Sequence, residues 1–348
     1  MKNLFALICA YVHATIFHAD DVFSAAFLRL VRPELPIYRT CKFTDAQIAE
    51  INEDKAIAVD IGAQYGITEY DHHQKDKVPG KDLRPDGTIY CGFGKLWRDY
   101  GYLLCPYKKA WEKVDRNLVL SIDNADNGVE PSTLSAAIHA FNPAWNSKED
   151  ENVAFWRAEK FAEAILRQYV DNANAEYEAE KLVLESRKEN KGKVLVLDQY
   201  LPWQDTVINQ MPYVLFVVYP SARGGYNVQT VPDAPGSFSG RVGFPEKWLG
   251  NPDKALGMTF CHPGNFLAAV DTLENAVNVA NIAIEETKKN YSVWFNDGFG
   301  DHGVIGFKDT KWSVQQYAKD HYIVDGYETK VIDDDNGKEM VLFSELKI

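Results

Sequence analysis

Two short apolar segments limit what the first sixty residues can fold into. Leu4–Val12 is fully apolar, and Ala56–Ile61 is apolar except for Asp60 near its end. Strands of this kind are typical of parallel sheets, whose two faces are both covered. The elements expected between them are a helix at Asp21–Val31, a strand at Pro36–Thr40 and a helix at Thr44–Asn52. This alternation predicts an α/β fold with a doubly wound, mainly parallel sheet.

Two helices are expected in the following part of the chain. Tyr107–Ile122 has apolar residues at helical spacing, and Phe155–Lys188 is the longest helical pattern of the chain. No GxGxxG motif follows the first strand, which disfavours a dinucleotide-binding fold. Gly92-Phe-Gly94 is too short for a phosphate-binding loop. We interpret it as a tight strand-to-helix turn, with a substrate contact as the alternative.

After residue 191 the composition changes, and the pattern predicts a smaller C-terminal α+β domain. The expected elements are strands at Val194–Leu197, Val214–Tyr219 and Tyr226–Val231, and a helix at Asp271–Lys289. From about Lys308 a tail follows, with a two-strand hairpin around Asp335-Asn-Gly337 formed by Glu328–Val331 and Met340–Phe343. The predicted division is a catalytic domain at 1–150, a connecting helix at 151–191, a substrate-binding domain at 192–307 and an extension at 308–348.

Composition limits the partners and the compartment. The formal net charge of −13 argues against coating of long duplex nucleic acid, although bound cations would allow a nucleic-acid substrate to be held locally. The five cysteines are scattered without CxxC spacing, as in a reduced protein. The segment Lys2–Val12 resembles a short signal peptide but is short for one. No apolar stretch approaches the ~20 residues of a membrane span. We therefore expect a cytoplasmic protein with no membrane partner, and a homodimer is the alternative to a monomer.

Acids and histidines gather where the predicted strands end. His13 and His18 precede Asp20 after the first strand, and Asp60 ends the strand at Ala56–Ile61. Eleven residues further on stands Asp71-His72-His73, and Asp123 follows the predicted helix Tyr107–Ile122. Sites in parallel α/β sheets form at the carboxyl ends of strands. The alternatives are a solvated turn for Asp71-His72-His73, ordinary strand-end polarity for the first two histidines and a helix-terminal turn for Asp123.

These residue types suit a pair of divalent cations. Imidazole and carboxylate ligands without thiolate favour Mn²⁺, with Mg²⁺, Fe²⁺ or Zn²⁺ as alternatives. About six ligands are too many for one tetrahedral zinc and fit two ions roughly 3.5–4 Å apart. Such a pair activates water for in-line attack on phosphorus. The mutual repulsion of the acids also argues that cations lie among them.

The order of these motifs resembles that of the DHH phosphoesterase superfamily. His13-Ala-Thr-Ile-Phe-His-Ala-Asp-Asp21, Val59-Asp-Ile-Gly62 and Glu69-Tyr-Asp-His-His-Gln74 are more closely similar to the Myg-type family, also labelled metal-dependent protein hydrolases. That family includes a eukaryotic RNA 3′–5′ exonuclease. The resemblance runs from residue 4 to about 290 and implies a DHH-like first domain.

The resemblance also implies a role for each matching residue. One Mn²⁺ would be held by His13, His18 and Asp60, and the second by Asp20, Asp60, His72 and Asp123. Asp60 would then bridge the two ions. His73 would contact the phosphate or lie just behind the ligands, and Asp71 would orient its neighbours, so Asp60, Asp71 and His73 are the predicted catalytic residues.

Two further residues are predicted to bind substrate. Ser239-Gly-Arg241 and Phe260-Cys-His262 resemble C-terminal segments of the same family, which implies that Arg241 and His262 clamp the substrate phosphate. A surface ion pair or a satisfied core histidine is the alternative for these two residues.

Three functions remain open from the sequence. The first is a two-metal phosphodiesterase, a 3′–5′ exonuclease acting on RNA or short oligonucleotides. The second is the same chemistry on a small phosphoanhydride or cyclic nucleotide, which the net acidity favours slightly because long polyanions are repelled. The third is a metal-binding module without turnover.

Overall fold

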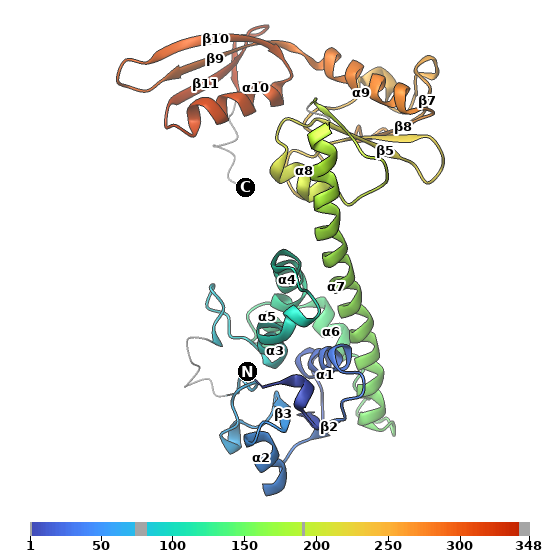
Figure 1. Ribbon diagram of the computed structural model, residues 1–348, viewed down its shortest axis with the longest axis vertical. Coiled ribbons are helices and arrows are strands. Elements are labelled where there is room, and N and C mark those ends of the chain that lie inside the picture. The colour runs from blue at the N-terminus through green and yellow to red at the C-terminus, as the bar shows by residue number, and fades with distance from the viewer. Residues whose placement is uncertain (1, 74–81, 190–191, 341–348) are drawn as a thin grey trace. The chain divides into compact units, whose positions relative to one another are not determined.

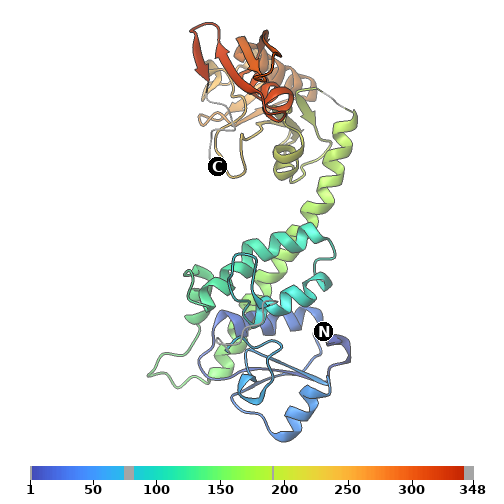
Figure 2. The same cartoon turned by 90° about the vertical axis from the view of Figure 1, so that its left-hand side faces the viewer.

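The computed structural model describes residues 2–73, 82–189 and 192–340 of the chain. The chain forms two compact units, residues 1–177 and 178–348. The long helix α7 (Glu151–Glu189) belongs to both and appears as one continuous green helix in Figures 1 and 2. This confirms the longest helical pattern of the sequence. The predicted four-part division at 150, 191 and 307 stays a prediction.

A three-stranded parallel sheet organises the first unit. β1 (Cys9–His13) lies between β2 (Ile37–Thr40) and β3 (Ala56–Val59) and runs parallel to both. Alternate side chains of a strand face opposite sides of the sheet. Ala10 therefore packs into the core around α1 and α3, whereas Tyr11 packs into the core beside α2. Figure 1 shows α2 on one side of this sheet and α1 on the other. The predicted α/β class with a parallel sheet is therefore confirmed.

Helices build the rest of the first unit around a core that includes the fully buried Trp97 and Phe93. A π-helical turn at Asp115–Val119 joins two of these helices. The helices that precede α7 are α1 (Ala19–Val31), α2 (Asp45–Asn52), α3 (Gly92–Tyr100), α4 (Lys108–Val114), α5 (Leu120–Asp126) and α6 (Thr133–His139).

Two local predictions were wrong. The first strand begins at Cys9 and not at Leu4, because the side chain of Asn3 accepts a hydrogen bond from the backbone N–H of Phe5 and caps a 3₁₀ turn at Leu4–Ala6. Gly92-Phe-Gly94 is not a turn before a helix but the first turn of α3 itself.

The second unit contains two further sheets. The larger has the order β4-β5-β6-β8-β7, with only β4 and β5 parallel, and α8 and α9 pack against it. The predicted antiparallel pair, β5 with β6, is confirmed. Its elements are β4 (Val194–Val196), α8 (Gln204–Gln210), β5 (Phe216–Pro220), β6 (Tyr226–Thr230), β7 (Met258–Cys261), β8 (Leu267–Val270) and α9 (Leu273–Thr287).

The last sheet is antiparallel, in the order β10-β9-β11-β12, with α10 on one face. It begins before the predicted tail, because β9 pairs with both β10 and β11. The predicted terminal hairpin is confirmed by the pairing of β11 with β12, although residues 341–343 lie outside the described residues. Its elements are β9 (Lys289–Asn296), β10 (His302–Asp309), α10 (Lys311–Ala318), β11 (Glu328–Asp333) and β12 (Lys338–Met340).

Candidate metal centre

The carboxyl ends of β1 and β3 place the first polar side chains of the site. β1 ends at His13, and Asp60 follows the last residue of β3. Asp60 has a φ of +57°, a left-handed conformation that a non-glycine residue adopts at a cost of about 1–3 kcal/mol. Its N–H donates to the carbonyl oxygen of Tyr70 at 2.9 Å, which holds this conformation and ties the strand end to the loop that carries Asp71-His72-His73.

The first turn of α1 supplies two buried acids. His18 is the N-cap residue, and its N–H donates to the carboxylate of Asp21 at 3.1 Å. Asp20 is fully buried and accepts hydrogen bonds from the N–H groups of Gly92 and Phe93, the first residues of α3. The first turn of one helix therefore presents acids to the positive end of another.

Glycine is required where α3 meets these acids. A Cβ at Gly92 would lie 2.8 Å from Cγ1 of Val59 and 3.0 Å from the carbonyl oxygen of Tyr70. A Cβ at Gly94 would lie 2.2 Å from Oδ1 of Asp123. The two glycines thus let the helix backbone approach the strand end and the buried carboxylates closely.

Asp71 holds its neighbour His73 in place. The Asp71 carboxylate accepts hydrogen bonds from Nδ1 of His73 at 2.7 Å and from the N–H groups of Ala63 at 2.7 Å and His73 at 3.0 Å. Burial acts against it, but these hydrogen bonds lower the pKa of Asp71 below its usual range. Its side chain is buried, whereas the His73 side chain is 57 % exposed. Asp71 therefore orients an imidazole that is open to solvent.

Two acids on α5 differ sharply in their surroundings. Asp123 is fully buried, and its carboxylate accepts hydrogen bonds from Nε of Arg84 at 2.5 Å and from the N–H of Cys91 at 3.0 Å. Burial raises the pKa of Asp123 to about 6 even though the Arg84 charge opposes this. Asp126, one helical turn further on, has Oδ2 3.1 Å from Nε2 of His72. Asp123 is thus neutralised by the protein, and Asp126 is turned toward the histidine.

Three overlapping groups of side chains could each hold a metal ion. Within each group the potential ligand atoms lie within 4.8 Å of one another, and Asp60 and His72 each belong to two groups. Among the residues that the structure describes, three buried atoms of these groups find no hydrogen-bond partner: Asp21 Oδ1, Asp60 Oδ1 and His72 Nδ1. Such orphaned buried atoms are costly unless a bound ion or water satisfies them. The groups are His13 with Asp21 and Asp60, Asp60 with His72 and His73, and Asp20 with His72 and Asp126.

The acids of these groups have raised pKa values. Burial raises the pKa of Asp21 to about 7; a side-chain hydrogen bond with Asp60 opposes this rise, and the nearby charge of Asp20 adds to it. Burial followed by repulsion from Asp20 and Asp21 raises the pKa of Asp126 to about 8 and that of Asp60 well above its usual range. Bare, the cluster retains protons near neutral pH. A divalent cation would favour the ionised carboxylates and displace those protons.

The histidines are prepared for metal binding in different ways. Burial lowers the pKa values of His13 and His72 below the usual range, so both rings are neutral, the form that binds metals. The hydrogen bond to Asp71 raises the pKa of His73, with burial acting in the opposite direction. His73 is therefore the ring most able to carry a positive charge at the open side of the cluster.

The structure brings together four of the six predicted metal ligands. His13, Asp20, Asp60 and His72 belong to the three groups, and the two others do not. His18 is exposed and stacks on His139, with ring centroids 6.0 Å apart. Asp123 pairs with Arg84, as described above.

Sequence reasoning missed Asp21 and Asp126, which are both in the groups. Asp21 is adjacent to the predicted ligand Asp20, and Asp126 is three residues from the predicted ligand Asp123. A spacing of three residues puts Asp123 and Asp126 on one face of a helix, which indicates that either acid can face the site.

The predicted substrate-binding residues lie in the second unit. Arg241 is buried, and its terminal nitrogens donate to the carbonyl oxygens of Ile208, Met211 and Val214 at 2.7–2.9 Å. Burial lowers the pKa of Arg241 to about 10. His262 lies in a turn where its Nδ1 accepts the N–H of Gly264 at 2.8 Å, which assigns the donor hydrogen of the ring to Nε2. Arg241 thus anchors the end of α8, and His262 is the more accessible of the two.

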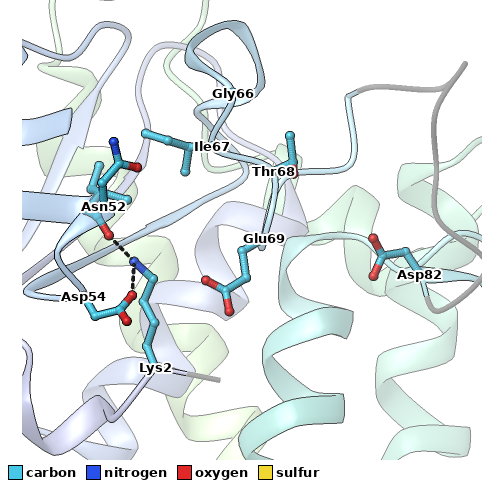
Figure 3. Close-up of a pocket in the computed structure, with 9 residues that line it drawn as sticks. Lys2, Asn52, Asp54, Gly66, Ile67, Thr68, Glu69 and Asp82 are labelled. Carbon is cyan, nitrogen blue, oxygen red and sulfur yellow. Dashed lines mark hydrogen bonds and ion pairs between the residues drawn. The ribbon is translucent and has the colours of Figure 1, made fainter. Parts of the chain in front are cut away.

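A separate polar cavity of about 390 Å³ lies in the first unit (Figure 3). Lys2 lines it together with the acids Asp54, Glu69 and Asp82. The ammonium group of Lys2 donates to the carbonyl oxygens of Ile51 and Ala56 and pairs with Asp54 at 3.2 Å. Contacts within the protein therefore already satisfy the lysine charge. None of the residues of the three metal groups lines this cavity.

Fold and site together define an α/β protein with a cluster of buried acids and imidazoles suited to divalent cations. The chain matches the family model MYG1_exonuc, an uncharacterised protein family (UPF0160), over residues 9–284, and it belongs to that family. It is 28% identical to the mouse MYG1 exonuclease over 336 residues, which cover 82% of this chain and 87% of the relative. No solved structure matches the chain.

Two other relatives extend the comparison. The human MYG1 exonuclease is 28% identical over 326 residues, covering 79% of this chain and 85% of the relative. The MYG1 protein of Dictyostelium discoideum is 25% identical over 323 residues, covering 80% of this chain and 96% of the relative. About a fifth of this chain therefore lies outside each comparison. In the part of the chain that the structure describes, no helix is long and apolar enough to cross a membrane.

Proposed function

We propose that this protein is a metal-dependent phosphodiesterase that removes nucleotides from the 3′ end of RNA or short oligonucleotides. The observation that carries the proposal is the convergence of Asp21, Asp60 and His72, each of which has one buried polar atom without a hydrogen-bond partner among the described residues. The names of the mouse and human relatives support a nuclease. A DHH-like, doubly wound first domain and a cytoplasmic location are parts of the same proposal.

The donor set fits two divalent cations, with Mn²⁺ as the expected ion. His13, Asp21 and Asp60 would hold one, and Asp20, His72 and Asp126 would hold the other. Asp60 also lies in a group with His72 and would contribute to both. Asp126 replaces Asp123 in this assignment because Arg84 already neutralises Asp123. Cations bound here supply charge neutralisation and an activated water for attack on phosphorus.

The chain's own residues would prepare the reaction. Asp71 holds the His73 ring by its Nδ1–H, so the Nε2 atom can approach a phosphate oxygen from the exposed side. A protonated His73 would stabilise the negative charge that develops on the phosphate. Arg241 and His262, both in the second unit, stay predicted substrate-binding residues.

Activity and metal binding of matched variants test the proposal. We expect the wild-type protein to shorten a 5′-labelled oligoribonucleotide stepwise in Mn²⁺, and Asp60→Ala to abolish this. Asp126→Asn should weaken Mn²⁺ binding at least about tenfold by calorimetry, whereas Asp123→Asn should change it far less. Turnover of a cyclic nucleotide without oligonucleotide laddering would favour the small-substrate alternative. Metal binding without turnover of either would refute the proposed enzyme activity.

A further inference from the structure

The strand β10 leaves a long backbone edge without a partner. It is the outermost strand of the sheet β10-β9-β11-β12 and spans eight residues, His302–Asp309. Figure 1 shows it at the rim of the orange sheet. Within 2–73, 82–189 and 192–340, no segment pairs with its outer side. The strand also lies beyond residue 284, where the family match ends.

The register identifies the backbone groups that point outward. The N–H of Asp297 donates to the carbonyl oxygen of Asp301 at 2.9 Å, so these two residues form a hydrogen-bonded pair at the end of the hairpin. Hydrogen-bonded and non-hydrogen-bonded pairs alternate along an antiparallel ladder. The N–H and C=O groups of the non-bonded pairs point away from β9. On β10 these are the groups of His302, Val304, Gly306 and Lys308.

Other edges in the second unit are protected in ways that β10 is not. β12 is three residues long and carries Lys338 and Glu339, β4 is also three residues long, and β7 contains a register shift at Met258–Phe260. Short strands, charges and bulges are the usual protections against edge pairing. From His302 to Phe307 the edge of β10 has no Asp, Glu, Lys or Arg, and Val304 is 63% exposed.

Gly306 supplies an independent observation. A Cβ at this position would meet nothing within 4 Å, and the residue does not have a positive φ. Gly303 differs, because a Cβ there would lie 3.0 Å from the ring of Phe295. Glycine within a strand costs about 0.5–1 kcal/mol and often marks the close approach of another backbone. The nearby ring of Phe295 explains why residue 303 is glycine. No contact among the described residues explains why residue 306 is glycine.

We propose that the outer edge of β10 pairs antiparallel with β10 of a second copy of this chain, which joins two sheets into one. A two-fold axis through Ile305 places Gly306 of each copy opposite Val304 of the other, so the small residue makes room for the exposed branched one. This self-complementarity favours a second copy over an unrelated strand. The homodimer is independent of the phosphodiesterase function, because β10 contributes no residue to the metal centre.

Sedimentation of four proteins over a wide concentration range tests the dimer. The wild type should show a concentration-dependent monomer–dimer equilibrium. Val304→Pro removes one outward N–H but no bond of the β9 ladder, and it should sediment as a monomer with unchanged thermal stability when dilute. Val304→Lys should weaken dimerisation at least about tenfold by placing like charges near the two-fold axis. Val153→Lys changes a valine of similar exposure on α7 and should dimerise like the wild type.

Hydrogen exchange provides the second measurement. Backbone amides of Val304 and Gly306 should become protected as the wild-type concentration rises, and should stay unprotected in Val304→Pro. A wild type that remains monomeric at high concentration would overturn the proposal. So would a Val304→Pro dimer as stable as that of the wild type, since the pairing would then lie elsewhere.

Discussion

Replacing Asp126 by asparagine should stabilise the metal-free protein at alkaline pH. The pKa of Asp126 rises from an ordinary 3.8 to about 8 on folding, chiefly through burial. The folded form therefore holds a proton that the unfolded chain releases. Stability from this proton is fully present below about pH 4 and is lost as the pH rises through about 8. An asparagine keeps the shape of the side chain and has no proton to lose.

The magnitude follows from the two pKa values. Each unit of pKa difference between the folded and unfolded states corresponds to about 1.4 kcal/mol. An isolated group with this shift would therefore lower the free energy of unfolding by about 5 kcal/mol at pH 8. Asp126 shares its repulsion with Asp20 and Asp21, so we expect roughly half of that, about 2–3 kcal/mol. For a unit of this size, such a gain corresponds to a rise in melting temperature of roughly 5–10 °C.

Thermal melting in a chelating buffer from pH 5 to pH 9 measures the effect. His13 and His72 oppose it below about pH 6.5, because the unfolded chain takes up protons that these buried rings do not. Subtracting the profile of the variant from that of the wild type removes their contribution. The exposed Asp45→Asn provides a matched control and should leave the profile unchanged.

Adding Mn²⁺ should reduce the stability advantage of the variant. Ions at a hundredfold excess over the dissociation constant stabilise a folded protein by about 2.7 kcal/mol. The wild type should gain this stabilisation from Mn²⁺, and the Asp126→Asn protein should gain much less because it binds the ion more weakly. A difference profile that is flat between pH 5 and 8, or equal stabilisation of both proteins by Mn²⁺, would refute the reasoning.

Further predictions concern side chains that hold the site. Gly94→Ala should cost about 1–3 kcal/mol in urea unfolding, because its Cβ would lie 2.2 Å from Oδ1 of the fixed Asp123; a loss below 0.5 kcal/mol would show that the carboxylate moves freely. Arg84→Met should cost about 3–5 kcal/mol, since it leaves Asp123 and Asp115 without their partner, and the double variant with Asp123→Asn should recover part of that loss. Arg241→Met should destabilise the second unit by about 2–4 kcal/mol in the same assay, because three carbonyl oxygens lose their donor, and should leave Mn²⁺ affinity unchanged.

Much of the fold follows from local patterns in the sequence. Ala56–Ile61 and Pro36–Thr40 are short, apolar or β-branched segments flanked by turn residues, and both contain strands of the structure. Thr44 caps α2 with Gln47 three residues later, a pairing that is visible in the sequence. The strand predicted at Leu4 fails because one side chain, Asn3, starts a 3₁₀ turn instead. Hydrophobicity alone cannot distinguish these outcomes.

The ligand set is harder to predict because it depends on partners far along the chain. Asp123 and Asp126 have the same chemistry and share one helix face. Arg84, 39 residues before Asp123, pairs with that acid and leaves the other turned toward His72. Similarly, Asp20 and Asp21 are adjacent, and the position of α3 decides that Asp20 receives the N–H groups of Gly92 and Phe93.

The protein's own donors separate the acids of the first unit into two sets. Asp20 is compensated by the N–H groups at the start of α3, and Asp123 by Arg84 and the N–H of Cys91. Asp21 and Asp60 each keep a buried oxygen that no described residue satisfies with a hydrogen bond. A purely structural cluster would have no reason to leave these oxygens unsatisfied, because each costs about 1–3 kcal/mol. The cost is understandable if a cation is the missing partner of Asp21 and Asp60. Asp123 then shapes the site, and the N–H groups of α3 fix the position of Asp20, which would hold the second ion as well.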